Sequence, residues 1–106
     1  MSKCKEIICN DTNIIKLPRL PLCEKISIYD CYNLIIDDIT IFENCIKFIC
    51  ERSDIKYLPK LPKCLVIWCD SCLLLEFIQD MPMCEIFELI NCPKLLSEKL
   101  STNGIY

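Results

Sequence analysis

Apolar and polar positions along this chain recur in a pattern with a period of about 20 residues. Each repeat opens with a cysteine at position 1 and has apolar residues at positions 4 and 6. A small or thiol residue follows at position 9, and an aliphatic residue at position 11 or 12. The opening cysteines lie 19, 22, 19 and 20 residues apart, at Cys4, Cys23, Cys45, Cys64 and Cys84. A fixed period of this length is typical of a solenoid, in which each unit packs only against its neighbours.

Positions 4 and 6 alternate with positions 3, 5 and 7, which predicts one short strand per unit, with two inward and three outward side chains. We therefore expect one domain, residues 1–106, folded as an α/β-type solenoid dominated by β structure. One parallel sheet of about five strands should form, with strands centred on residues 7–9, 26–28, 48–50, 67–69 and 87–89. Residues 97–106 form a tail that is a candidate cover for the end of the solenoid.

The segments that return the chain to the next strand contain prolines. The motif L-P-x-L-P occupies residues 17–21 and 58–62. Proline fixes φ and donates no hydrogen bond, which favours an irregular, polyproline-like convex side over helices. The return of the second unit, residues 35–44, has no proline, and we expect a strand-like or 3₁₀ turn there. At position 9 the chain must turn, and a thiol or hydroxyl there can bond the backbone.

All 11 cysteines stand at positions 1, 6 or 9 of a unit. Their odd number, the absence of an apolar signal segment at the start, and their inward positions all oppose the disulfide framework of a secreted protein. We therefore expect buried, reduced thiols that act as small hydrophobic residues. Zinc bound by the C-x-x-C of Cys69 and Cys72 is the alternative. It is disfavoured because histidine is absent and no second C-x-x-C completes four ligands.

The composition argues against several other functions. A cysteine nucleophile usually needs a histidine base, and Gly104 alone cannot form a phosphate-binding loop, so we expect neither an enzyme nor a cofactor. The pair Asp37-Asp38 is interpreted as a solvated acidic turn. The net charge of −3 gives nucleic-acid binding no overall support, although five basic residues gather on the convex returns. No apolar stretch approaches the length of a membrane span, so neither membrane insertion nor secretion is expected.

Outward positions are apolar in units three to five and mostly polar in units one and two. The apolar outward residues are Ile46, Ile49, Leu65, Val66, Trp68, Ile86 and Ile90. An exposed apolar patch around a tryptophan is typical of a protein-binding surface, so we predict that these residues contact a protein partner on the concave face. Coverage by the tail or by a second copy is the alternative, and the few obvious caps favour self-association.

The strings L-P-K-L-P-K-C-L-V-I-W-C at 58–69 and L-P-R-L-P-L-C at 17–23 resemble the cysteine-rich leucine-rich-repeat proteins of giant DNA viruses, such as marseilleviruses and mimiviruses. They are more distantly similar to the L-P-x-L-P repeats of bacterial secreted effectors. The resemblance covers nearly the whole chain. It implies a leucine-rich-repeat interaction scaffold in the cytoplasm of an infected host cell or in the virion.

Three hypotheses follow. The first is a non-enzymatic module that binds a host or viral protein through its concave face. The second is a structural protein, minor capsid or virion-associated, packed against other virion subunits. The third is a metal or redox protein that uses its thiols.

Overall fold

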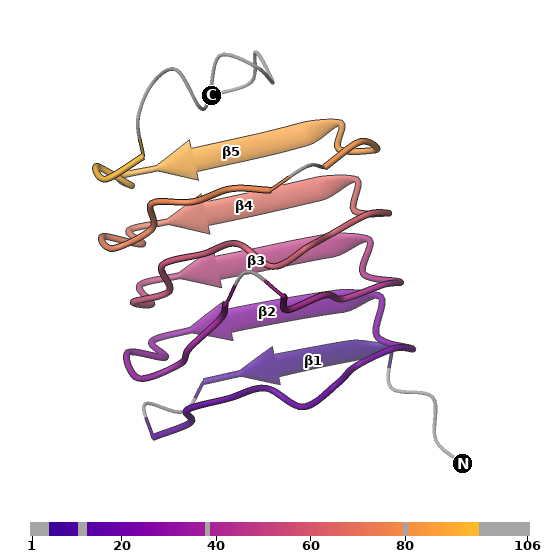
Figure 1. The fold of residues 1–106 in the computed structure, drawn as a ribbon, viewed down its shortest axis with the longest axis horizontal. Coiled ribbons are helices and arrows are strands. Elements are labelled where there is room, and N and C mark those ends of the chain that lie inside the picture. The colour runs from indigo at the N-terminus through magenta and orange to yellow at the C-terminus, as the bar shows by residue number, and fades with distance from the viewer. Residues whose placement is uncertain (1–4, 11–12, 38, 80, 96–106) are drawn as a thin grey trace.

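The computed structural model describes residues 5–10, 13–37, 39–79 and 81–95. Its five strands form one parallel sheet in chain order, β1-β2-β3-β4-β5 (Figure 1). The strands are β1 (Glu6–Cys9), β2 (Lys25–Tyr29), β3 (Lys47–Glu51), β4 (Val66–Asp70) and β5 (Ile86–Ile90). Every predicted strand centre falls within the corresponding strand, and the described ranges contain no helix. The predicted solenoid with one five-stranded parallel sheet is therefore confirmed. Cys4 and the tail 97–106 lie outside the described residues.

The register places equivalent positions of successive units side by side. Ile26 pairs with Ile7 on one side and Phe48 on the other, and the row at position 4 continues through Ile67 and Phe87. Four of these five side chains are buried, and Ile7 on the edge strand is partly buried. Because the side-chain period of a strand is two, this register fixes which residues of every strand face outward.

The chain turns sharply after the strands through a left-handed residue at position 8. The φ angles of Asp30, Arg52, Ser71 and Asn91 are 56°, 50°, 59° and 54°. Aspartate and asparagine tolerate this region best, whereas arginine adopts it less readily. The turn directs the residue at position 9 back into the core, where Cys31, Ser53 and Cys72 are fully buried.

At position 9 the side chains bond the backbone, as predicted. The Ser53 hydroxyl accepts a hydrogen bond from the Cys31 N–H at 3.0 Å and donates to the Glu51 carbonyl at 3.1 Å. The Cys31 thiol donates to the Tyr29 carbonyl at 3.3 Å. These bonds satisfy backbone groups that the turn would otherwise leave buried and unpaired. Thr12, the equivalent residue of the first unit, lies outside the described residues.

The return segments cross one face of the sheet as irregular chain (Figure 1). Two isolated parallel bridges join neighbouring returns, Ile41 to Lys60 and Tyr57 to Phe77. The first bridge lies in the proline-free return of unit two, where a strand-like segment was expected. A turn precedes it, in which Asp37 Oδ1 accepts a hydrogen bond from the Thr40 hydroxyl at 2.8 Å. This is the predicted acidic turn, of which Asp38 lies outside the described residues.

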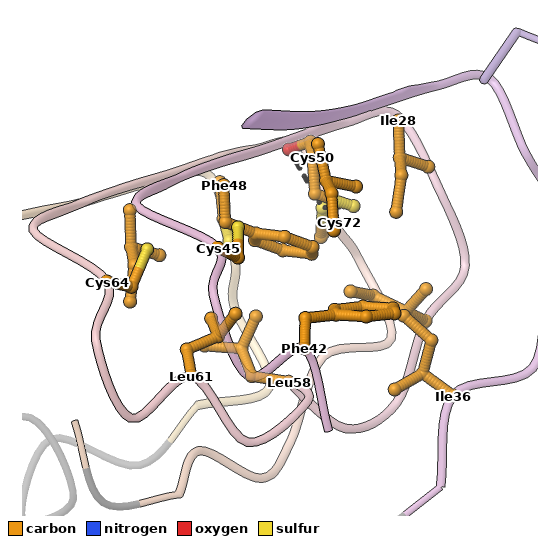
Figure 2. Packing of buried hydrophobic residues seen from close by; sticks show 14 of the residues in the cluster. Ile28, Ile36, Phe42, Cys45, Phe48, Cys50, Leu58, Leu61, Cys64 and Cys72 are labelled. Atoms are coloured by element: carbon orange, nitrogen blue, oxygen red, sulfur yellow. Dashed lines mark hydrogen bonds between the residues drawn. The ribbon is translucent and has the colours of Figure 1, made fainter. Parts of the chain in front are cut away.

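The core fills the space between the sheet and the returns. Phe42 from a return faces Phe48 of β3, with ring centroids 6.5 Å apart (Figure 2). Of the opening cysteines, Cys23, Cys45 and Cys64 are buried, as predicted. Cys84 is only half-buried, so the prediction of full burial is wrong at this position. In the described part of the chain, its unit stacks against a neighbouring unit on one side only.

Candidate functional site

The outer face of the sheet, turned away from the returns, carries five of the seven predicted contact residues. We call these the apolar outer patch: Ile49, Val66, Trp68, Ile86 and Ile90, on β3, β4 and β5. The other two, Ile46 and Leu65, each precede the first residue of a strand. They belong to a different surface, a groove along the side of the sheet where the strands begin, which we call the edge groove.

Trp68 lies at the centre of the apolar outer patch. In the register it stands between Ile49 of β3 and Glu88 of β5, and Val66 precedes it by two residues on the same face. The tryptophan is 36% exposed, while Ile86 and Ile90 are 48% and 42% exposed. Large apolar side chains in contact with solvent at adjacent strands offer a partner a continuous area to bury.

The outward positions of units one and two are mostly polar, as predicted, and Ile8 is the apolar exception. Ser27 points outward by register but is only 1% exposed, because this small side chain stands between the larger Ile8 and Ile49 of the adjacent strands. Ile8 is 64% exposed and adds an apolar side chain at the β1 edge.

Charged residues flank the apolar outer patch on two sides. Lys25 and Lys47 occupy position 3 of β2 and β3, at the strand beginnings, and Lys25 pairs with Glu6 at 3.4 Å. Glu51 and Asp70 occupy position 7 of β3 and β4, at the strand ends. The face thus has lysines at the strand beginnings and carboxylates at the strand ends, and Glu88 of β5 adds a carboxylate between Ile86 and Ile90.

The edge groove was not foreseen as a separate surface. It has a volume of about 620 Å³ and is lined by apolar and polar residues of units one to four: Leu22, Glu24, Asn44, Ile46, Lys63, Leu65 and Met83. Lys63 donates a hydrogen bond to Asn44 Oδ1 at 3.2 Å on its wall. The signal in the sequence is the residue immediately before each opening cysteine, which is apolar at Leu22 and Met83.

The cysteines line the core in rows that follow the repeat, and the thiol of Cys72 interacts with those of Cys50, Cys69 and Cys92. None of the ten in the described ranges forms a disulfide, and no group of three or more residues that could hold a metal ion occurs among the described residues. Contact with the Cys72 thiol, together with burial, raises the pKa of Cys50 well above its usual range. A thiol in this state is protonated at neutral pH and a poor nucleophile.

No helix within the described ranges is long and apolar enough to cross a membrane. Comparisons of the chain with models of protein families, with curated proteins and with solved structures found no match.

Proposed function

We propose that this protein is a non-enzymatic interaction module that binds a protein partner through the apolar outer patch. The observation that carries the proposal is Trp68, which stands 36% exposed in the middle of an apolar surface on a regular sheet. Tryptophan combines a large apolar area with an N–H group, and it is enriched among the residues that dominate binding energies. The resemblance to leucine-rich-repeat proteins of giant viruses favours a viral origin and a role in the infected cell.

The rigidity of the sheet supports this role. Every residue of the patch is on a strand, and each strand is held in register by its neighbours. A surface that is already ordered loses little conformational freedom when a partner binds, so more of the contact energy appears as affinity.

The charges around the patch define the chemistry of the partner. Lys47, at the strand beginnings, favours an acidic group on the partner, and Asp70, at the strand ends, favours a basic one. Lys25 and Glu51 already have ion-pair partners in Glu6 and Arg52. Complementary charges of this kind mainly set the orientation of the partner and the association rate, while the apolar centre supplies affinity.

The test compares three immobilised proteins at equal load: wild type, Trp68→Ala and Leu74→Ala. Leu74 is a matched control, because it is 38% exposed and lies in the turn after β4, outside the patch. Partners should be captured by wild type and Leu74→Ala and lost with Trp68→Ala. Each captured partner is then purified and titrated against wild type, Trp68→Ala and Leu74→Ala.

The proposal is supported if Trp68→Ala, and not Leu74→Ala, has a dissociation constant roughly thirtyfold higher than that of wild type. Equal affinity of all three proteins contradicts it. Stoichiometric amounts of the protein in purified virions, with the patch protected from labelling there, favour the structural virion role instead.

A further inference from the structure

Two pairs of buried thiols are in contact across neighbouring turns of the solenoid. The sulfur atoms of Cys9 and Cys31 lie 3.3 Å apart, and those of Cys50 and Cys72 lie 3.6 Å apart. Each pair joins position 6 of one unit to position 9 of the next, and the two residues are 22 positions apart in both cases. The second pair repeats the first after 41 residues. The contact is therefore a recurrent feature of the repeat.

The turn geometry produces this contact. Position 6 points inward from the strand, and the left-handed residue at position 8, Asp30 or Ser71, turns position 9 toward the preceding unit. The thiols of Cys31 and Cys72 consequently reach the backbone carbonyls of Cys9 and Cys50, at 3.5 and 3.4 Å. Figure 2 shows Cys72 directed at Cys50 within the core.

We propose that Cys9–Cys31 and Cys50–Cys72 are sites of cross-turn disulfide formation by exchange with a small-molecule disulfide of the glutathione class. The sulfurs need to approach by about 1.5 Å to reach the length of an S–S bond, a movement that side-chain rotation can supply. The protein is reduced in a thiol-rich buffer and becomes covalently cross-linked when this oxidant predominates.

The exchange proceeds in two steps. A deprotonated thiol of the pair attacks one sulfur of the small disulfide, forms a mixed disulfide and releases one small thiolate. The second protein thiolate then attacks the first protein sulfur and displaces the other small thiolate. The two protons of the protein thiols end on the released thiolates, so the protein loses two electrons and two protons and the oxidant is reduced to two thiols.

Burial sets the order in which the two pairs react. Cys9, on the edge strand β1, is 8% exposed, whereas Cys31, Cys50 and Cys72 are fully buried. The pair Cys9–Cys31 therefore oxidises first, and Cys50–Cys72 follows at the rate of local opening.

The cross-links would join unit one to unit two and unit three to unit four, but not unit two to unit three. At that junction the equivalent residues are Ile28 and Ser53, which cannot form a disulfide. It is held by the hydrogen bond from the Cys31 N–H to the Ser53 hydroxyl. Oxidation thus cross-links units one and two and units three and four, and it leaves two junctions without a cross-link, that of units two and three and that of units four and five.

The test incubates the folded wild-type protein with glutathione disulfide and quenches samples with iodoacetamide. Digestion by trypsin and Asp-N isolates each thiol on its own peptide, because residues 6–10, 30–36, 48–52 and 70–79 each contain one cysteine. We expect 6–10 to become linked to 30–36 first, and 48–52 to 70–79 later. The thermal midpoint should rise by about 10 °C and return to its original value with dithiothreitol.

Three variants separate the sites. Cys31→Ser should abolish only the first cross-link and Cys72→Ser only the second, while Cys23→Ser should retain both. The mapping of the wild type remains decisive if a variant does not fold. Linkage of other cysteines, such as Cys45 to Cys64, overturns the proposal. So does a protein that stays fully reduced under native conditions and oxidises only in urea.

Discussion

Arg52 reaches back across one turn of the solenoid and binds Asp30 with two hydrogen bonds, Nε to Oδ1 at 2.8 Å and Nη2 to Oδ2 at 3.2 Å. Both residues occupy position 8 and both have a left-handed backbone. Arginine is an uncommon choice for that conformation, since its side chain gives no local support to the turn. The fork of the guanidinium compensates by bonding the preceding turn bidentately.

This ion pair predicts an acid-dependent component of stability. The hydrogen bond from Arg52 holds the pKa of Asp30 below its usual range. A carboxyl group whose pKa is lowered by folding stabilises the native state above the pKa of the unfolded chain, near pH 4, and that contribution disappears as the pH falls through the folded value. The thermal midpoint of wild type should exceed that of Asp30→Asn at pH 7, and the difference should shrink progressively as the pH falls below about 4 and through the folded pKa.

Two further measurements check the same pair. Added salt should reduce the difference at pH 7, because both groups are solvent-accessible. Removal of the partner in Arg52→Gln should reduce the acid-dependent component as well, and the hydrogen bond from the Tyr32 hydroxyl to Asp30 should maintain the remainder. A difference between wild type and Asp30→Asn that persists unchanged at pH 2 shows that the carboxylate acts by some route other than its charge.

Ser53 stabilises the turn of the third unit through hydrogen bonds to the backbone. It is fully buried, and its hydroxyl is both acceptor for the Cys31 N–H and donor to the Glu51 carbonyl. Ser53→Ala leaves that N–H buried without its partner, so we expect the free energy of unfolding to fall by about 1–3 kcal/mol. Ser53→Cys introduces the residue type found at the same position in units two and four, and should be milder. Urea unfolding of the three proteins measures both effects, and equal losses contradict the turn-bonding role.

The opening thiols donate to the carbonyl two residues further on. Cys45 Sγ lies 3.3 Å from the Lys47 oxygen, and Cys23 and Cys64 make the same contact. A serine at this position finds an acceptor in place, so Cys45→Ser should lower the free energy of unfolding by only about 1 kcal/mol, through loss of sulfur contacts. Cys45→Ala loses the donor as well and should be less stable than Cys45→Ser. The reverse order in urea unfolding would assign the position to apolar packing alone.

Strand positions and outward rows could be predicted from the sequence because the period-two pattern and the 20-residue repeat constrain each other. Inward positions 4 and 6 in five successive units leave one register that buries them all. The returns have no comparable period. The edge groove was missed because Leu22 and Met83 precede the strands, where no alternation indicates a direction. The burial of Ser27, whose position is outward by register, could not be predicted because it depends on the size of its neighbours in the sheet.

Phe42 is a residue of a return segment that contributes to the hydrophobic core. It is 2% exposed, stacks with Phe48, and belongs to the proline-free segment. Phe42→Leu should lower the free energy of unfolding by about 1–2 kcal/mol, since it leaves part of the ring volume empty. Ile39→Ala in the same return is the control, because Ile39 is 74% exposed and its truncation should change stability by less than about 0.5 kcal/mol. Similar losses in the two variants, measured by thermal unfolding, would mean that the return does not pack as described.

Trp68 gives the sharpest prediction about function, because its burial is incomplete and its direction is outward. The core beneath β4 is formed by Ile67 and Cys69, both fully buried, and Trp68 alternates with them on the opposite face. Trp68→Ala should therefore lower the thermal midpoint by no more than a few degrees, about as much as a surface substitution with partial burial. Loss of a central contact in a complex typically weakens binding by 2 kcal/mol or more, about thirtyfold in affinity. Thermal unfolding of each preparation tests the expected thermal midpoint, and titration of the same preparation with the partner tests the expected loss of affinity. A Trp68→Ala protein that unfolds, with Leu74→Ala intact, would place the tryptophan in the structural core and remove the basis for binding through the outer face.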